Sequence, residues 1–408
     1  MDPVIHVHAP PGPDVEAFIA LIDGFNNRNI DPTSWRLESH IGVKALDTLI
    51  AERHGEIVVL ADKPWLTDSA NLPHLDAITA QEALAVDIMT GRHSALARLR
   101  NLIIAAPDLF GALDGGDGPA LEFSSTHHLL KTVDGRPLRR PPWFYDSSMQ
   151  GDGLVDIQSH YVDQAQWILG PDHHFDVDRD VEMLDAKRWS LPVPLEVFRE
   201  STGDAAFPDD LTEMVEDGNL HLACNARVGY RMRRVHVRQH CEWGLREAPG
   251  GGDVHGFTAR GEKTVLTIRN DPETGFRPRM GLRRHDNQDI EPALGKWRAT
   301  FSALEARPGD EGYLLSLPSR AEVAHEAQFP DMLDQFLDLV EAEVWPDELM
   351  ARIRARYTLL ARARARAGDR ALRTWIAGTR AATLGPCRNG HSVCWRRSLP
   401  LTSQAIRA

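Results

Sequence analysis

Long apolar runs and paired cysteines are scarce in this sequence of 408 residues. No apolar stretch approaches the ~20 residues that a membrane span needs, which argues against a membrane protein. The first residues show no basic region followed by an apolar one, so no secretory signal is indicated and we expect a cytoplasmic protein. The cysteines have neither zinc-site spacing nor the density of a disulfide scaffold, which favours reduced, structural thiols. They are Cys224, Cys241, Cys387 and Cys394.

Basic residues are also scarce over most of the chain. The net charge is −13, but 13 arginines and a single acidic residue, Asp369, follow residue 350, so residues 1–350 carry −25. An acidic body of this kind excludes nucleic acid as a partner, because such binding depends on Lys and Arg neutralising phosphates. The alternating Ala and Arg of residues 361–368 fit an exposed basic helix, a phosphate-binding patch or low-complexity sequence, and a charge run most often forms a solvated face.

Apolar patterns divide the rest of the chain into two parts. In residues 1–110 strand and helix patterns alternate, which is typical of an α/β domain with a parallel sheet. Expected strands lie at residues 4–8 and 57–60, and expected helices at 14–22, 43–53, 71–86 and 95–104. Ligands of such domains bind beyond the carboxyl ends of the strands, where Lys63 stands.

Residues 111–350 show the pattern of an α+β domain. The glycine-rich stretch 111–118 marks the boundary, and apolar residues then alternate through 220–232. Residues 235–243 and 257–268 continue this pattern, so an open antiparallel sheet is predicted. A helix over 323–344 has an apolar stripe that is expected to cover this sheet. The remaining residues, 351–408, are predicted to form an Arg-rich helix and a disordered tail.

One segment carries an acid/base pattern. The apolar residues of 154–169 recur at helical spacing, and Asp156, His160 and Asp163 then share another face of the expected helix. A carboxylate one turn from a histidine can orient the ring and prepare it to accept or donate a proton. Gly151 and Gly153 just before it allow another backbone or a ligand to approach closely.

Two other interpretations of this pattern remain open. An Asp and a His four residues apart often form a surface or interdomain hydrogen bond without any catalytic role. His127, His128 and His160 are possible metal ligands, but nothing local has the spacing of a metal site, so we expect no metal.

Three motifs resemble the Gfo/Idh/MocA family of NAD(P)-dependent oxidoreductases, and more narrowly its branch with the putative oxidoreductase C-terminal domain. They are VLADKP at 59–64, the DIMT run at 87–90 and the long segment 141–163 that contains GDGLVDIQSHYVD. The resemblance covers roughly residues 3–365. It implies a Rossmann-like nucleotide-binding domain, an open antiparallel sheet through which copies of the chain pair, NAD or NADP as cofactor, and a sugar-like substrate.

The resemblance also implies roles for individual residues. Lys63 contacts the nicotinamide and the substrate hydroxyl, His160 takes the hydroxyl proton, and Asp156 binds the substrate and steadies the site. Cofactor contacts fall on Asp62, Lys63 and Pro64. The residues assigned to substrate binding are Asp163, His127, His128 and Trp143.

The sequence departs from the family pattern in its nucleotide-binding part. No glycine-rich turn for the pyrophosphate occurs before Val4, and one strand at 58–62 stands where relatives have a strand, a helix and another strand. We therefore expect a truncated Rossmann-like domain and an oxidoreductase acting on a sugar or cyclitol hydroxyl, with activity impaired by this loss. The alternatives are a non-catalytic binding or assembly subunit and an NAD-assisted glycoside hydrolase or lyase.

Overall fold

A computed structural model describes most of the chain. The described residues are 4–9, 16, 19–20, 36–41, 58–61, 63–66, 72–79, 85–133, 135–170, 175–285, 289–309, 311–317, 328–342, 346–368 and 405–407. The expected helix at 43–53 lies outside them, as does most of the helix at 14–22. None of the described helices is long and apolar enough to cross a membrane.

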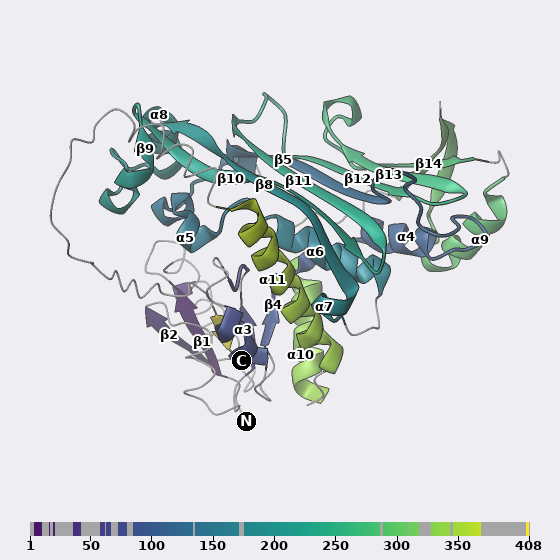
Figure 1. The fold of residues 1–408 in the computed structure, drawn as a ribbon, viewed down its shortest axis with the longest axis horizontal. Coiled ribbons are helices and arrows are strands. Elements are labelled where there is room, and N and C mark those ends of the chain that lie inside the picture. The colour runs from purple at the N-terminus through teal and green to yellow at the C-terminus, as the bar shows by residue number, and fades with distance from the viewer. Residues whose placement is uncertain are drawn as a thin grey trace, which may run out of the picture.

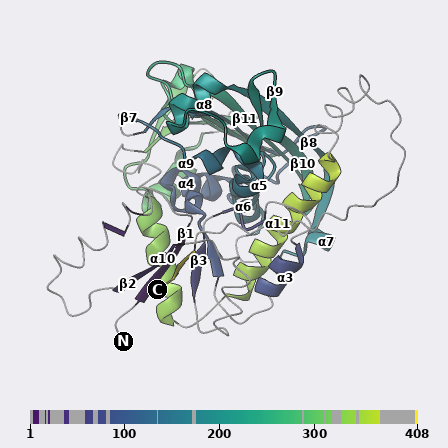
Figure 2. The ribbon, with the colours of Figure 1, turned by 90° about the vertical axis from the view of Figure 1, so that its left-hand side faces the viewer.

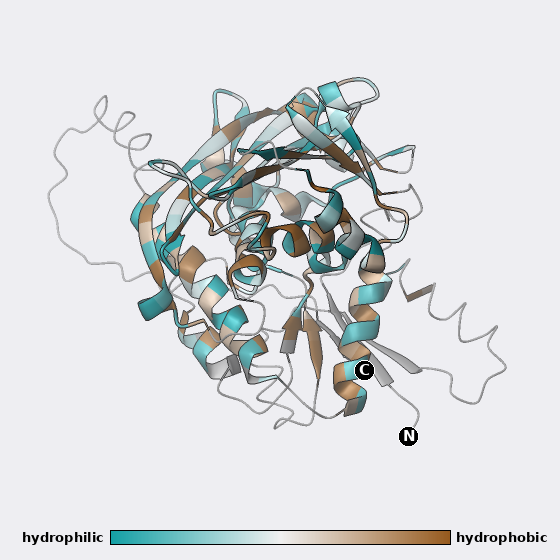
Figure 3. Ribbon diagram, turned by 90° about the vertical axis from the view of Figure 1, so that its right-hand side faces the viewer, coloured by the Kyte–Doolittle hydropathy of each residue, from teal (hydrophilic) through white to brown (hydrophobic). Residues whose placement is uncertain are grey.

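The first part of the chain forms a small sheet with the strand order β2-β1-β17-β3-β4. β1 pairs with β2 in parallel, and β3 pairs with β4 in parallel, as an α/β domain requires. β17 lies antiparallel between β1 and β3. β3 is hydrophobic along its length (Figure 3), and all three of its residues are buried. The bounds are Val4–Ala9 (β1), Arg36–Ile41 (β2), Val59–Ala61 (β3), Ala85–Asp87 (β4) and Ala405–Arg407 (β17).

Short helices follow these strands. The predicted helix at 95–104 is confirmed as α4, Ala95–Ile104, whose first turn is capped by the Ser94 hydroxyl accepting from the Ala97 N–H at 3.4 Å. The predicted helix at 71–86 is shorter, because α3 spans Leu72–Thr79 and β4 then begins at Ala85. A 3₁₀ turn, η2 (Thr90–His93), joins β4 to α4.

The second part forms a ten-stranded sheet with the order β15-β16-β14-β13-β12-β5-β11-β10-β8, and β9 pairs with β10. The alternating segments form its centre as predicted, but β5 runs parallel to β11, so the sheet is mixed rather than purely antiparallel. The bounds are Leu121–Leu130 (β5), Val181–Pro194 (β8), Val215–Glu216 (β9), Asn219–Met232 (β10), Val235–Arg246 (β11), Val254–Arg260 (β12), Thr264–Asn270 (β13), Arg279–Arg284 (β14), Glu305–Gly309 (β15) and Gly312–Ser316 (β16).

Helices and short turns connect these strands. β6 (Thr132–Val133) and β7 (Arg136–Pro137) form a separate hairpin. The helical elements are η3 (Pro142–Tyr145), α5 (Ser147–Gln150), α6 (Gln158–Leu169), α7 (Val177–Asp180), α8 (Leu195–Thr202), η4 (Asp209–Met214), η5 (Pro272–Thr274), α9 (Glu291–Thr300), α10 (Gln328–Ala342) and α11 (Asp347–Ala367). Figure 1 shows the large sheet above and the small sheet below it.

One face of the large sheet is apolar and covered. α6 lies between the two sheets (Figure 2), and its Tyr161 stacks on Phe123 of β5 with ring centroids 5.4 Å apart. Phe257 of β12 packs against the same Phe123 at 5.0 Å. The other face is exposed and carries ion pairs such as Arg231–Glu182 at 3.1 Å, as expected for a sheet with one solvated face.

The predicted cover of the large sheet by the helix at 323–344 is wrong. This segment forms α10, and its buried Met332 and Phe336 pack with Leu60 of β3 and Val86 of β4, on the small sheet. The apolar stripe of a helix predicts that the helix packs on an apolar surface, but it does not predict which one. The hydrophobic effect depends on the apolar area that is buried and not on a specific partner.

α11 joins the two parts of the molecule instead. It lies against β8 and α6 of the second part and against α3 and β4 of the first (Figure 2). Its Ile353, Tyr357 and Leu360 are almost completely buried. Within the Arg run, Ala361 and Ala363 are buried, and Arg364 lies 3.1 Å from the buried carboxylate of Asp152. The run therefore does not form only a solvated face.

Candidate active site

The end of β3 delivers a lysine to the region between the sheets. Lys63 stands two residues after β3 and is joined to Pro64 by a cis peptide bond. Its ammonium group donates to the Oδ1 atom of Asp156, and the two side chains are only 16% and 9% exposed. Because β3 and β4 are parallel, this lysine lies at the carboxyl edge of the small sheet, where α/β folds bind ligands.

Asp156 is held by a turn and not by the helix. The predicted helix at 154–169 begins only at Gln158, so Asp156 precedes α6 and does not share a helical face with His160. The N–H groups of Val155 and Asp156 donate to the Asp152 carbonyl at 2.9 and 3.0 Å. The sequence pattern overestimated the helix because apolar residues at 154 and 157 also suit a buried turn.

Buried charges fix this turn. The Asp152 carboxylate accepts from Leu154 N–H at 2.9 Å and from Arg188 at 2.5 Å. Arg364 of α11 lies 3.1 Å from the same carboxylate. Asp152 is almost completely buried, so its partners in β8 and α11 compensate its charge and locate the turn.

Gly153 lets the turn approach β10, as its place in the sequence suggested. Its N–H donates to the Ala223 carbonyl at 2.9 Å. A Cβ atom at this position would stand 2.4 Å from the Cys224 carbonyl oxygen and 2.6 Å from the Asn225 carbonyl carbon. Only glycine fits here without moving backbone.

We therefore expect Gly153→Ala to displace the turn. The overpacking should cost about 1–3 kcal/mol of unfolding free energy, measured by chemical denaturation. Gly295→Ala is the matched control, because a Cβ there meets nothing within 4 Å and lies within helix α9, where alanine is preferred. Equal stability of the two variants would contradict the tight contact.

The charge of Asp156 is maintained by its neighbours. Burial raises the pKa of this carboxyl group, but the ammonium of Lys63, hydrogen bonds from Lys63 and Gln150, and the charge of His160 together bring the pKa below its ordinary value. Asp156 is thus an anion at neutral pH. This anion holds Lys63 in one position and favours its charged form.

His160 occupies the first turn of α6, and its side chain is half-buried. It follows Asp156 by four residues, and its positive charge lowers the pKa of that carboxyl group. Lys63, Asp156 and His160 therefore come together from the end of β3, the turn and α6. A base, a cation and a carboxylate in one place can move a proton and stabilise a negative oxygen.

The covered face of the large sheet adjoins this group. Burial raises the pKa of Cys241 in β11 to about 12, and the charges of Lys63 and Asp156 also act on this thiol. Two residues further along β11 on the same face, Trp243 pairs in register with His127 of β5. Their rings lie 5.1 Å apart, so His127 belongs to the same wall.

His127 and His128 gather around Asp253. The His127 Nδ1 atom lies 3.0 Å from Asp253 Oδ2, and the His128 N–H donates to Oδ1 at 3.2 Å. Lys131 donates to Oδ2 at 2.5 Å. Burial raises the pKa of Asp253, but the hydrogen bonds and charges of His127 and Lys131 lower it well below its ordinary value.

Asp163 pairs with two arginines, and its assignment to substrate binding stays a prediction. Its carboxylate accepts two hydrogen bonds from Arg92, each 2.8 Å long, and another from Arg356 of α11. Arg356 also donates to both oxygens of Asp87 at 2.7 Å. These four side chains, Asp87, Arg92, Asp163 and Arg356, join β4, η2, α6 and α11. The spacing of residues in the sequence gave no signal for Arg356.

The remaining assigned residues are placed as follows. Trp143 lies in η3 and is half-buried. Pro64 is buried against Gly151, where a Cβ would stand 3.2 Å from its ring. Asp62 lies outside the described residues. The substrate and cofactor roles of these residues stay predictions.

Comparison with known proteins matches residues 99–367 to the family described as "Putative oxidoreductase C terminal domain". The chain is also similar to the crystal structure of a "putative oxidoreductase" from Parabacteroides merdae, at 30% identity, with 90% of this chain and 92% of that chain covered and a TM-score of 0.80. The chain belongs to this oxidoreductase family. The resemblance to Gfo/Idh/MocA-type oxidoreductases is thereby confirmed.

Another similar structure is a "putative oxidoreductase" from Erwinia carotovora atroseptica, at 13% identity, with 87% and 89% of the two chains covered and a TM-score of 0.51. Comparison with curated proteins finds no match. The oxidoreductase family match includes Asp156, His160 and all of α11, whereas Lys63 precedes it. The expected fold class, a small parallel-sheet α/β part followed by a part with a large open sheet and helices, is confirmed.

Proposed function

We propose that this chain is an NAD(P)-dependent oxidoreductase that acts on a sugar or cyclitol hydroxyl, with Lys63, Asp156 and His160 as its reacting groups. The observation that carries the proposal is the buried Lys63–Asp156 ion pair, which brings the end of β3 to the turn before His160. Two sheets enclose this group, so water is partly excluded from the reacting atoms.

The residues present fit a nicotinamide. Lys63 and Pro64 follow a parallel strand at its carboxyl end, where dinucleotides bind in folds of this class. Together with Asp62 they would hold the nicotinamide end of the cofactor. When bound, the nicotinamide supplies the hydride acceptor, which protein side chains do not provide.

The side chains would then divide the proton chemistry among them. The imidazole of His160 accepts the proton of the substrate hydroxyl, since its ordinary pKa lies near neutrality. The Lys63 ammonium stabilises the negative charge that develops on the same oxygen. Asp156 positions Lys63 and keeps it charged, which requires the lowered pKa of that carboxyl group.

Cofactor titration tests the proposal. We expect NADH or NADPH to bind the purified full chain, followed by fluorescence, and Lys63→Met to weaken binding. Lys187→Met is the control, because Lys187 is exposed on β8 and lies over Trp189 rather than near Asp156. Absence of binding at millimolar cofactor would overturn the proposal and favour a non-catalytic binding subunit.

Substrate class is tested by turnover. Purified protein with NAD or NADP is expected to oxidise members of a panel of sugars and cyclitols, observed as nicotinamide absorbance. If acyclic alcohols but no polyhydroxylated rings were oxidised, the sugar or cyclitol assignment would be wrong while the oxidoreductase assignment would remain.

A further inference from the structure

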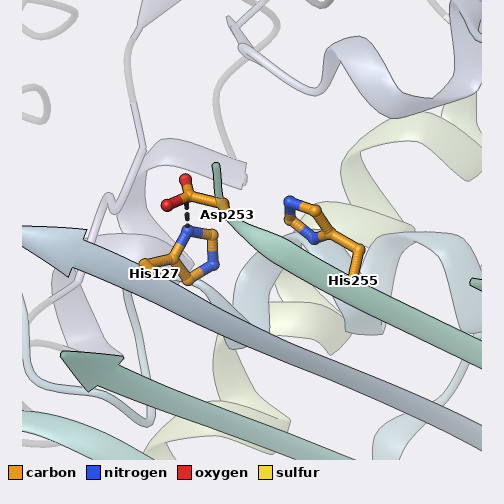
Figure 4. A group of neighbouring side chains, drawn as sticks. All are labelled: His127, Asp253 and His255. Atoms are coloured by element: carbon orange, nitrogen blue, oxygen red, sulfur yellow. Dashed lines mark hydrogen bonds and ion pairs between the residues drawn. The ribbon is translucent and has the colours of Figure 1, made fainter. Parts of the chain in front are cut away.

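A second group of polar side chains lies on the covered face of the large sheet. His127 of β5, Asp253 just before β12 and His255 of β12 each offer a ligand atom, and these atoms all lie within 4.8 Å of one another. Figure 4 shows the Asp253 carboxylate next to the His127 ring, with the His255 ring on the neighbouring strand. His127 and Asp253 are 126 residues apart in sequence, so no local spacing could indicate the group.

The pairing of β5 with β12 brings these residues together. Val254 is in register with Thr126, which places Asp253 beside His127 and His255 on the adjoining position of the neighbouring strand. The two imidazole rings meet edge to face with centroids 5.4 Å apart. The arrangement is thus set by sheet register and not by a mobile loop.

His127 turns its Nδ1 atom towards the other members of the group. This atom lies 3.0 Å from Asp253 Oδ2, so one ion placed beside both atoms can bind them together. His127 is only 9% exposed, so its ring is held in place by the surrounding protein.

The chemistry of the three side chains selects the ligand. Two imidazoles and one carboxylate are the donor set of catalytic zinc and of other divalent first-row transition metals. Ligand atoms around such an ion stand about 3.4 Å apart when each bond is about 2.0–2.1 Å. The three atoms lie within 4.8 Å of one another, so binding an ion requires only that the group close slightly.

We infer that His127, Asp253 and His255 form a binding site for a divalent transition-metal ion on the substrate side of the large sheet. Three protein ligands leave coordination positions open, and the exposed His255 places them towards solvent. Lys131 occupies Asp253 Oδ2 in this structure and competes with the ion for that oxygen. The site is independent of the nicotinamide chemistry proposed above.

Metal titration of the full chain, stripped with a chelator and free of nicotinamide, tests the site. One equivalent of Zn²⁺ should bind, and Co²⁺ should give the visible absorption of an ion with nitrogen and oxygen ligands. His255→Ala should weaken Zn²⁺ binding at least about 10-fold, since even indirect changes around a metal site cost this much. Lys131→Met should strengthen it by removing the competing cation.

A matched control separates this site from surface histidines. His240 lies 3.3 Å from Glu242 on the opposite, exposed face of β11, and His240→Ala should leave Zn²⁺ affinity unchanged. Equal affinity in the His255 variant and the wild type, or loss of binding in the His240 variant alone, would overturn the inference. Failure of NADH binding has no bearing on either result, so the two proposals fail separately.

Discussion

Replacing His160 by asparagine is expected to lower kcat by about 10²–10⁴-fold, the usual contribution of a general acid/base residue. Asparagine retains a hydrogen-bonding side chain on the first turn of α6 but cannot take a proton from a hydroxyl. The affinity for NADH or NADPH should stay unchanged, because the proposal assigns the nicotinamide to Asp62, Lys63 and Pro64 and not to His160. Steady-state rates and cofactor titration, measured on one preparation, separate the two effects.

The pH profile gives this prediction a readout that a structural role would not produce. In the wild type, kcat/KM should rise with pH as the imidazole loses its proton, since only neutral His160 is a base. This limb should disappear in the asparagine variant. His240→Asn, on the exposed face of β11, is the control and should keep the full profile. Normal turnover after the His160 change would identify the Asp156 and His160 neighbours as purely structural.

Local patterns predicted the large sheet well. β10 and β11 alternate apolar and polar residues over 219–232 and 235–246, because one face is covered and the other carries exposed ion pairs. This signal lies within each strand. The parallel insertion of β5 beside β11 could not be predicted, because which strands pair depends on contacts between segments far apart in sequence.

The candidate site shows the same difference between what local motifs predict and what depends on long-range contacts. Lys63, Asp156 and His160 were indicated by motifs, and the structure pairs Lys63 with Asp156 in the turn that precedes the helix of His160. Asp163 belongs to the same motif, yet its partners come from η2 and α11 and separate it from Lys63. A motif records which residues occur together, but the burial of each carboxylate decides what it contacts.

α11 is the element that the sequence patterns predicted least well. Replacing its buried Arg356 tests how much this helix contributes to stability. We expect Arg356→Met to lower the free energy of unfolding by about 3–5 kcal/mol, because it leaves the carboxylates of Asp87 and Asp163 buried with less compensation. Arg356 is only 2% exposed, so water cannot replace the guanidinium. Chemical denaturation of the two proteins measures the difference.

The neighbouring arginine provides the matched control. Arg354 forms a 2.7 Å ion pair with Asp76, but both side chains are about half exposed, so Arg354→Met should cost less than about 1 kcal/mol. An equal loss in both variants would show that burial is not the cause.

The sign of the pH dependence tests the mechanism of this loss. In the wild type, burial raises the pKa of Asp87, and the charge of Arg356 limits this rise. Arg92 and Arg356 lower the pKa of Asp163 despite its burial. Without Arg356 both pKa values must rise, so the folded state of the variant takes up protons that the unfolded chain does not. Its deficit should therefore be full at neutral pH and shrink as the pH falls towards the ordinary carboxyl range near about 4. A deficit that stays constant with pH would instead point to lost packing along α11.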